Sequence, residues 1–125
     1  MLLEVKEVLT RISFSYGLIV IKEETFSGCS SLSSIQLPDS VSQIQYQAFY
    51  KCTKLEGINL DTVTELKYGA FSNCENLVPI TLSERLITLE ENVFTGCVKL
   101  TSYGYPDSVI EQYAYDNYIP FEHMP

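Results

Sequence analysis

The sequence predicts a repeat solenoid of about five stacked coils of 22–23 residues, with parallel strands, short helical turns and a C-terminal helical cap. One observation behind this is a phenylalanine that recurs at an almost constant interval along the chain. Another is that a cysteine follows each phenylalanine by three residues, and a leucine follows each cysteine by three. A unit this short cannot bury its own apolar side, so we expect equivalent residues to stack in one shared interior. The residues of this structural ladder are Phe26, Phe49, Phe71 and Phe94, Cys29, Cys52, Cys74 and Cys97, and Leu32, Leu55, Leu77 and Leu100.

The length of 125 residues and the apolar content of 46% suit a single folded domain over residues 1–125. We expect a degenerate N-terminal coil over residues 1–22, regular repeats over residues 23–107 and a cap over residues 108–125. In the N-terminal coil, Leu3 stands at the phenylalanine position and Lys6 at the cysteine position. The remaining pattern positions of this coil hold only apolar residues, which are Leu9, Ile12, Phe14, Leu18 and Ile21.

A strand is predicted in each unit by the spacing seen in "LSSIQL". Ile35 and Leu37 are two residues apart, which places both on one strand face. Pro38 ends the strand because it has no N–H to donate. A turn at "DS" follows, and then a short extended or irregular return segment, "VSQI". In later units the two inward positions fall on Ile58 and Leu60, Ile80 and Leu82, and Tyr103 and Tyr105.

The stretches "YQAF", "YGAF" and "ENVF" each suit one short helical turn. Two residues after each phenylalanine, a left-handed residue is expected to close this turn. Gly28, Asn73 and Gly96 fit that position, whereas Lys51 fits it less well.

The C-terminal pattern changes from Ser108 onward. Ser108 is a candidate N-cap, and Val109, Ile110 and Tyr113 have a spacing near 3.6, so we expect a helix that covers the last coil. Pro120 stops the helix, and Phe121 is expected to pack back. The region is rich in tyrosine, which suits either the rim of a cap or a stacking surface for a sugar ring or a partner.

The cysteines raise the question of a metal site or a disulfide. They form no C-x-x-C pair, and the chain has one histidine, His123. Their repeat spacing favours buried free thiols, with a disulfide and a metal site as the weaker alternatives. No nucleotide-binding, hydrolase or metalloprotease motif occurs. We therefore expect no enzyme activity, no catalytic residue, no metal and no cofactor.

The outward strand positions are the candidate partner-binding face. They are small or polar, so they suit a shallow contact surface for protein or glycan, or a passive solvated sheet. The candidate residues are Arg11, Ser13, Ser34, Gln36, Asn59 and Thr81, and the remaining outward positions are Gly57, Pro79, Ser102 and Gly104.

The formal net charge of −8 and the scattered acidic residues argue against nucleic acid or an anionic membrane as a partner. No apolar run reaches the roughly 18 residues that a membrane span needs, so membrane insertion is not expected. The start, "MLLEVKEVL", lacks the uninterrupted apolar core of a signal peptide. The chain is therefore expected either to stay in the cytoplasm or to lack a leader in this sequence.

The stretches "FSGCSSLSSIQLPDSV", "AFYKCTKLEGINL" and "YGAFSNCENL" resemble the BspA-type leucine-rich repeat over about residues 20–110, and "VIEQYAYDNYIPF" resembles an ending common in that family. The N-terminal segment 1–20, the shortened second unit and Tyr103-Gly104-Tyr105 depart from the pattern. The resemblance implies a right-handed leucine-rich-repeat β-solenoid with one curved sheet. It also implies a secreted or cell-surface protein of bacteria or some protists that serves adhesion and protein contact.

The function expected from the sequence is a non-catalytic protein–protein interaction or adhesion module of a bacterial surface or secreted protein. Its partner would be a protein, a host or matrix protein among the candidates, or a glycan. A structural spacer repeat and an intracellular leucine-rich-repeat scaffold in the cytoplasm are the alternatives.

Overall fold

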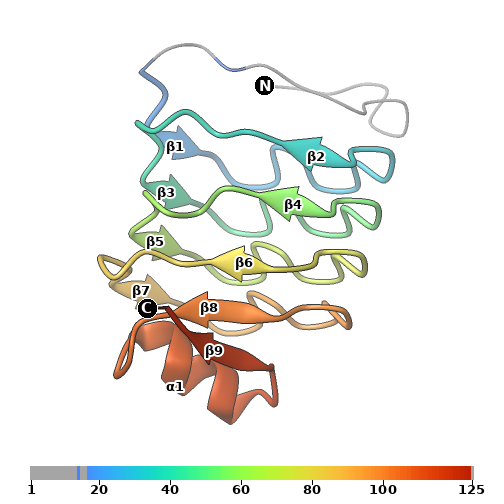
Figure 1. The fold of residues 1–125 in the computed structure, drawn as a ribbon. Coiled ribbons are helices and arrows are strands. Elements are labelled where there is room, and N and C mark those ends of the chain that lie inside the picture. The colour runs from blue at the N-terminus through green and yellow to red at the C-terminus, as the bar shows by residue number, and fades with distance from the viewer. Residues whose placement is uncertain (1–13, 15–16, 125) are drawn as a thin grey trace.

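The chain winds into a stack of coils with parallel strands, as predicted (Figure 1). The structure is a computed structural model, and it describes residue 14 and residues 17–124. One row of strands forms a four-stranded sheet with the order β1-β3-β5-β7. These strands are β1 (Val20–Ile21), β3 (Gln43–Ile44), β5 (Glu65–Leu66) and β7 (Thr88–Leu89).

A second row of strands forms two further sheets, of two and three strands. The expectation of one curved sheet is therefore wrong. The return segment, which contains β3, forms a sheet of its own with the equivalent segments of the neighbouring coils. The Ser42 N–H donates to the Ile19 carbonyl at 2.9 Å, and the Thr64 N–H donates to the Ser42 carbonyl at 2.8 Å. The strands of the second row are β2 (Ser34–Ile35), β4 (Gly57–Ile58), β6 (Ile80–Thr81), β8 (Ser102–Gly104) and β9 (Phe121–His123).

The second row is interrupted between β4 and β6. Pro79 occupies the place that Gly57 holds one coil earlier, and a proline has no N–H to donate to a strand ladder. On this side the two coils are linked by an isolated parallel bridge between Leu60 and Leu82, and by the Val78 N–H, which donates to the Glu56 carbonyl at 3.1 Å. One proline therefore explains why the row consists of two sheets.

The segments before each phenylalanine form consecutive hydrogen-bonded turns rather than short helices. Two residues in each unit have positive φ, one two residues before the phenylalanine and one two residues after it, and such residues interrupt a right-handed helix. The predicted left-handed conformation of Gly28, Asn73 and Gly96 is confirmed, and Lys51 adopts it as well, with φ of 58°. The positions before the phenylalanine, which were not anticipated, are Glu24, Gln47, Gly69 and Asn92.

Four phenylalanine rings stack through the interior. The centroid distances are 5.2 Å from Phe26 to Phe49, 5.0 Å from Phe49 to Phe71 and 5.7 Å from Phe71 to Phe94. All four rings are buried, and Phe14 packs edge-on against Phe26 at 5.8 Å. Offset stacking at such distances adds to the large apolar area that each ring buries.

In the last strand of the regular repeats, β8, the side chains that point inward are not the ones predicted. In β8 it is Ser102 and Gly104 that point inward and are buried, while Tyr105 is exposed. Ser102 pairs with Ile80, whereas the repeat pattern predicted Tyr103 at that place, so the strand is shifted by one position. Small residues are required because the cap packs directly on this strand. A Cβ on Gly104 would lie 2.6 Å from Cγ2 of Ile110.

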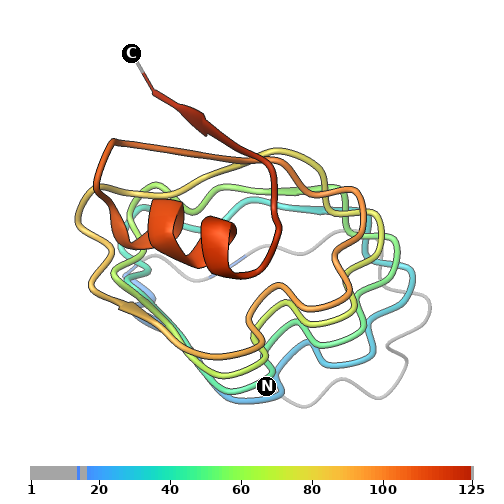
Figure 2. The same cartoon turned by 90° about the horizontal axis from the view of Figure 1, so that it is seen from below.

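The cap is helix α1 (Val109–Asp116), which lies across the C-terminal end of the stack (Figure 2). Ser108 is its N-cap, as predicted, and its hydroxyl accepts a hydrogen bond from the Glu111 N–H at 3.2 Å. The helix buries Ile110 and Ala114 against the last coil, whereas Val109 is exposed. The Tyr113 hydroxyl accepts a hydrogen bond from the Phe94 N–H at 3.3 Å.

Strand β9 completes the cap by pairing in parallel with β8. The Glu111 carboxylate links β9 to the start of the helix, because one oxygen lies 2.6 Å from Nε2 of His123 and the other accepts the Asp107 N–H at 2.7 Å. These two contacts, that with His123 first, hold the pKa of Glu111 below its ordinary value of 4.5.

Truncation of a central ring tests the stack. Phe71→Ala removes the ring between Phe49 and Phe94, and a core substitution of this kind costs about 3–5 kcal/mol. Since a single domain of this size has about 5–15 kcal/mol in total, we expect the variant to be largely unfolded at 37 °C in a circular-dichroism melt. The control is Ile87→Ala, because Ile87 is 76% exposed. Equal melting curves for the two variants would refute the stack.

The cap contact predicts a pH dependence. Because the folded-state pKa of Glu111 is lowered, its contribution to stability is present above the ordinary value of 4.5 and is lost as pH falls through the folded-state pKa. We expect Glu111→Gln to be less stable than the parent at pH 6 in urea unfolding. The difference should shrink steadily below pH 4.5. The matched control is Glu75→Gln, which removes an exposed carboxylate on a turn outside the cap contact.

Candidate functional site

The predicted partner-binding residues are only partly brought together. Ser34 and Gln36 are exposed on one coil, and Thr81 is exposed two coils further on. Arg11 and Ser13 lie outside the described residues. The structure therefore leaves a small polar surface on the β2 side, and Asn59 belongs to the coil between these exposed residues.

Asn59 is engaged within the fold. Its Oδ1 accepts the Leu37 N–H at 2.7 Å, and its Nδ2 donates to the Leu37 carbonyl at 2.9 Å. The side chain thus supplies the ladder bonds that a neighbouring strand would otherwise make. A role in partner binding would require Asn59 to give up these two bonds.

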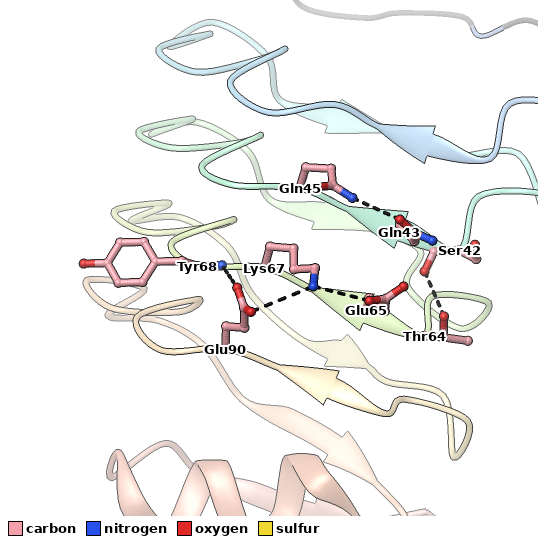
Figure 3. A network of polar contacts seen from close by, with 8 residues as sticks. All are labelled: Ser42, Gln43, Gln45, Thr64, Glu65, Lys67, Tyr68 and Glu90. Carbon is pink, nitrogen blue, oxygen red and sulfur yellow. Dashed lines mark hydrogen bonds and ion pairs between the residues drawn. The ribbon is translucent and has the colours of Figure 1, made fainter.

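The other row of strands carries a denser polar surface, shown in Figure 3, which sequence reasoning missed. Its members are side chains of β3, β5 and β7 and of the residues beside them. Lys67 bridges Glu65 at 3.4 Å and Glu90 at 3.9 Å. The Glu90 carboxylate also accepts the Tyr68 N–H at 2.9 Å, so these side chains tie two coils together.

The neighbouring coil on the same surface is neutral. The Gln45 side chain donates to Gln43 at 3.0 Å, and the Thr64 hydroxyl donates to the Ser42 carbonyl at 3.2 Å. The surface as a whole is therefore polar and internally ordered, a property that lowers the entropy lost when a partner binds.

Two exposed tyrosines stand at the edge of this surface. The Tyr46 and Tyr68 rings stack with centroids 5.8 Å apart and planes 15° apart, and they are 42% and 39% exposed. The Tyr68 hydroxyl accepts a hydrogen bond from the Asn92 amide at 2.9 Å. The sequence signal was present, since each tyrosine precedes its phenylalanine by three residues in "YQAF" and "YGAF". Aromatic residues at such surfaces are the usual anchors of protein contacts.

The tyrosines of the cap divide into two groups. Tyr113 packs edge-on against Phe94 at a centroid distance of 6.1 Å, and its burial raises the pKa of its hydroxyl. Tyr115 and Tyr118 are 81% and 95% exposed. A shallow cavity of about 370 Å³ lies between the last coil and the end of the helix, lined in part by Tyr113 and Tyr118. Tyr113 is therefore part of the cap. The exposed rings of Tyr115 and Tyr118 suit a stacking surface for a sugar ring or a partner.

The four cysteines are buried thiols that form no disulfide. Three of the thiols donate to the main-chain carbonyl of the phenylalanine in the preceding coil: Cys52 to Phe26 at 3.2 Å, Cys74 to Phe49 at 3.1 Å and Cys97 to Phe71 at 3.1 Å. Contact with the Cys52 and Cys97 thiols, together with burial, raises the pKa of the Cys74 thiol. A protonated thiol is a poor nucleophile and a poor metal ligand, so Cys74 acts as a packing residue and a cross-coil hydrogen-bond donor.

Neither a metal cluster nor a membrane-spanning helix is found in the part of the chain that the structure describes. There, no three His, Cys, Asp or Glu side chains lie close enough to hold a metal ion. Helix α1 has eight residues, and no helix within the described ranges has the length and apolarity to cross a bilayer.

Comparison with known proteins gives a family and a fold. Residues 5–121 match the model of the BspA type leucine rich repeat region, in six copies. A leucine-rich repeat protein from Bacteroides ovatus ATCC 8483 is similar in structure, with a TM-score of 0.76 and 35% identity, over 86% of this chain and 28% of that one. A leucine rich repeat protein from T. pallidum shares the fold at a TM-score of 0.59 and 22% identity, over 69% of this chain and 52% of that one. The search of curated proteins found no match.

The buried thiols predict a reactivity pattern. We expect none of the four cysteines to react with a thiol reagent such as DTNB within minutes in native buffer, and all four to react once denaturant is added. Val98→Cys is the positive control, because Val98 is 80% exposed and a thiol there should react at once. Rapid labelling of the parent chain in native buffer would contradict the burial of the four cysteines.

Proposed function

Because the chain belongs to the BspA-type leucine-rich repeat family, we propose that it is a non-catalytic protein-interaction and adhesion module of a bacterial surface or secreted protein. Leucine-rich repeat solenoids serve as scaffolds whose stacked units create extended binding surfaces. The chain spans 28% and 52% of the length of the two solved neighbours, so the proposal concerns this module alone.

The observation that supports this function best is the exposed surface along β1, β3, β5 and β7. It presents regularly spaced polar side chains and, at its edge, the Tyr46 and Tyr68 pair. A passive spacer has no need of exposed aromatic rings held in one orientation. The β2 side, with Ser34, Gln36 and Thr81, is the second candidate contact surface. The division into residues 1–22, 23–107 and 108–125 belongs to the same proposal.

The proposed location is the cell surface or the outside of the cell, because members of the family are often surface-associated in bacteria. The supporting facts are the family match and a similar solved protein of Bacteroides ovatus. A host or matrix protein is the partner class that such a location favours.

The test is direct binding of the purified chain to a panel of purified extracellular matrix proteins and to a glycan array. We expect saturable micromolar binding to at least one protein. A substitution on the contact surface, Tyr68→Ala, should weaken this binding by about tenfold, since aromatic anchors contribute most at interfaces. The matched control on the opposite side is Ser34→Arg, which should leave binding unchanged. Binding to glycans alone, or to no member of the panel, would contradict the proposal.

A further inference from the structure

Four side chains on the exposed surface form a single column, here called the tyrosine column: Glu23, Tyr46, Tyr68 and Glu91. The strand pairing that joins Ile21, Ile44, Leu66 and Leu89 sets their register, so each stands at the same place in its own coil. Main-chain bonds keep the coils together here, because the Gln47 N–H donates to the Tyr68 carbonyl at 3.0 Å and the Gly69 N–H donates to the Glu91 carbonyl at 3.2 Å. The column therefore runs carboxylate, ring, ring, carboxylate.

The two rings stack on each other, which leaves each with one outer face. The outer face of Tyr68 is turned toward the coil of Glu91, and that of Tyr46 toward the coil of Glu23. Both glutamates are exposed, and among the described residues neither carboxylate has a hydrogen-bond or ion-pair partner. Coils about 4.8 Å apart place each carboxylate within reach of a group that lies on the adjacent ring.

The charge on this surface favours a cation. Lys67 is already engaged with Glu65 and Glu90, and within the described ranges no ion pair is formed by the carboxylates of Glu23 and Glu91 at the two ends of the column. Five carboxylates face two ammonium groups here, and the whole chain carries −8. The charged residues are Glu23, Glu24, Glu65, Glu90 and Glu91 against Lys22 and Lys67. An acidic surface of this kind steers and orients basic partners.

The guanidinium group fits the column better than an ammonium group. It is planar, stacks on aromatic faces and pairs with a carboxylate through two parallel N–H bonds. A ring face with a free carboxylate one coil away offers both interactions at once. Lysine can satisfy the charge, but it has no plane to stack.

We propose that the tyrosine column binds arginine side chains of a basic, extended segment in the partner protein. One guanidinium lies on the outer face of Tyr68 and pairs with Glu91, and a second lies on the outer face of Tyr46 and pairs with Glu23. Two rings and two stacked cations span about 13 Å, which corresponds to arginines about four residues apart in an extended chain at about 3.3 Å per residue. This inference rests on the proposed function and names the chemistry of its partner.

The experiment uses a labelled peptide with two arginines four residues apart in a Gly-Ser background, and a matched peptide with two lysines. Binding to the full chain is measured by fluorescence anisotropy at low and at physiological salt. We expect the arginine peptide to bind at least fivefold more tightly than the lysine peptide. Glu91→Gln should weaken binding of the arginine peptide by about fivefold, and Tyr68→Ala by more.

Three variants separate recognition from folding and from general charge. Tyr68→Phe keeps the aromatic ring, so it should bind the arginine peptide like the parent. Comparison with Tyr68→Ala then shows whether the loss of binding comes from the loss of stacking. Glu75→Gln removes an exposed carboxylate outside the column, and Tyr115→Ala removes an exposed ring on the cap; both should bind like the parent.

Equal affinity for the two peptides, or equal weakening by Glu75→Gln and Glu91→Gln, would overturn the proposal in favour of unspecific charge attraction. Glycan binding that depends on Tyr46 and Tyr68, without peptide binding, would also overturn it. If the arginine peptide fails while a matrix protein still binds, the inference falls and the proposed function stands. If the arginine peptide binds as expected but no matrix protein does, the adhesion function falls and the column is an arginine site.

Discussion

The fold depends on the main-chain hydrogen bonds that join each turn to the next coil. Within the turn, alternate N–H groups point along the stack: those of Glu24, Phe26 and Gly28 donate to carbonyls of the second unit at 3.0, 2.8 and 2.7 Å. The N–H groups between them close the local turns. A backbone that alternates in this way requires left-handed residues on both sides of the phenylalanine. Lys51 therefore accepts a conformation that costs a non-glycine residue about 1–2 kcal/mol.

The same bonds generate both the interior and the candidate surface. Because equivalent residues lie one coil apart, rings at an inward position form the phenylalanine stack, and rings at an outward position form the Tyr46 and Tyr68 pair. The two stacks have similar centroid distances, 5.0 Å between Phe49 and Phe71 and 5.8 Å between the tyrosines. They differ in burial, so the geometry that stabilises the interior also holds an exposed aromatic pair in a fixed orientation. In this fold the repeat that stacks equivalent side chains in the interior also stacks equivalent side chains on the surface.

The sequence was sufficient for the repeat, the parallel strands and the start of the cap, because an almost constant repeat spacing and an N-cap serine can both be recognised from the order of residues alone. It was insufficient at β8, where Tyr103 and Tyr105 continued the apolar pattern by type. The structure puts Gly104 inward because Ile110 of the cap leaves no room for a Cβ. This contact is between β8 and α1, and the spacing of residues in the sequence does not show how closely these two elements pack. The row β1-β3-β5-β7 was not predicted as a sheet for a similar reason: its segments, such as "VSQI", were expected to be only short extended or irregular returns, and two-residue strands are recognised by their partners rather than by their composition.

The candidate site shows the same limit. Ser34, Gln36, Thr81 and Asn59 share an outward position in the pattern, yet Asn59 bonds to both main-chain groups of Leu37. The tyrosines were visible in the sequence at an equivalent place in each unit, but their stacking and the pairing of Lys67 with Glu65 and Glu90 depend on which return segments lie side by side. Side-chain roles at the surface therefore follow from neighbours one coil away, which are distant in the sequence.

The C-terminal end shows how the stack stops. Each earlier turn donates three N–H groups to the next coil, and at the last turn the Tyr113 hydroxyl replaces one of the three missing carbonyls by accepting the Phe94 N–H. Among the described residues no carbonyl or hydroxyl replaces the acceptors that the N–H groups of Asn92 and Gly96 would find in a further coil. The cap is therefore held less by hydrogen bonds to the turn than by Ile110 and Ala114 on the interior and by β9 on the edge of β8. A helix can end this solenoid because one of its faces covers the apolar interior. Its Tyr113 hydroxyl also accepts the Phe94 N–H, which would otherwise donate to a carbonyl of a further coil.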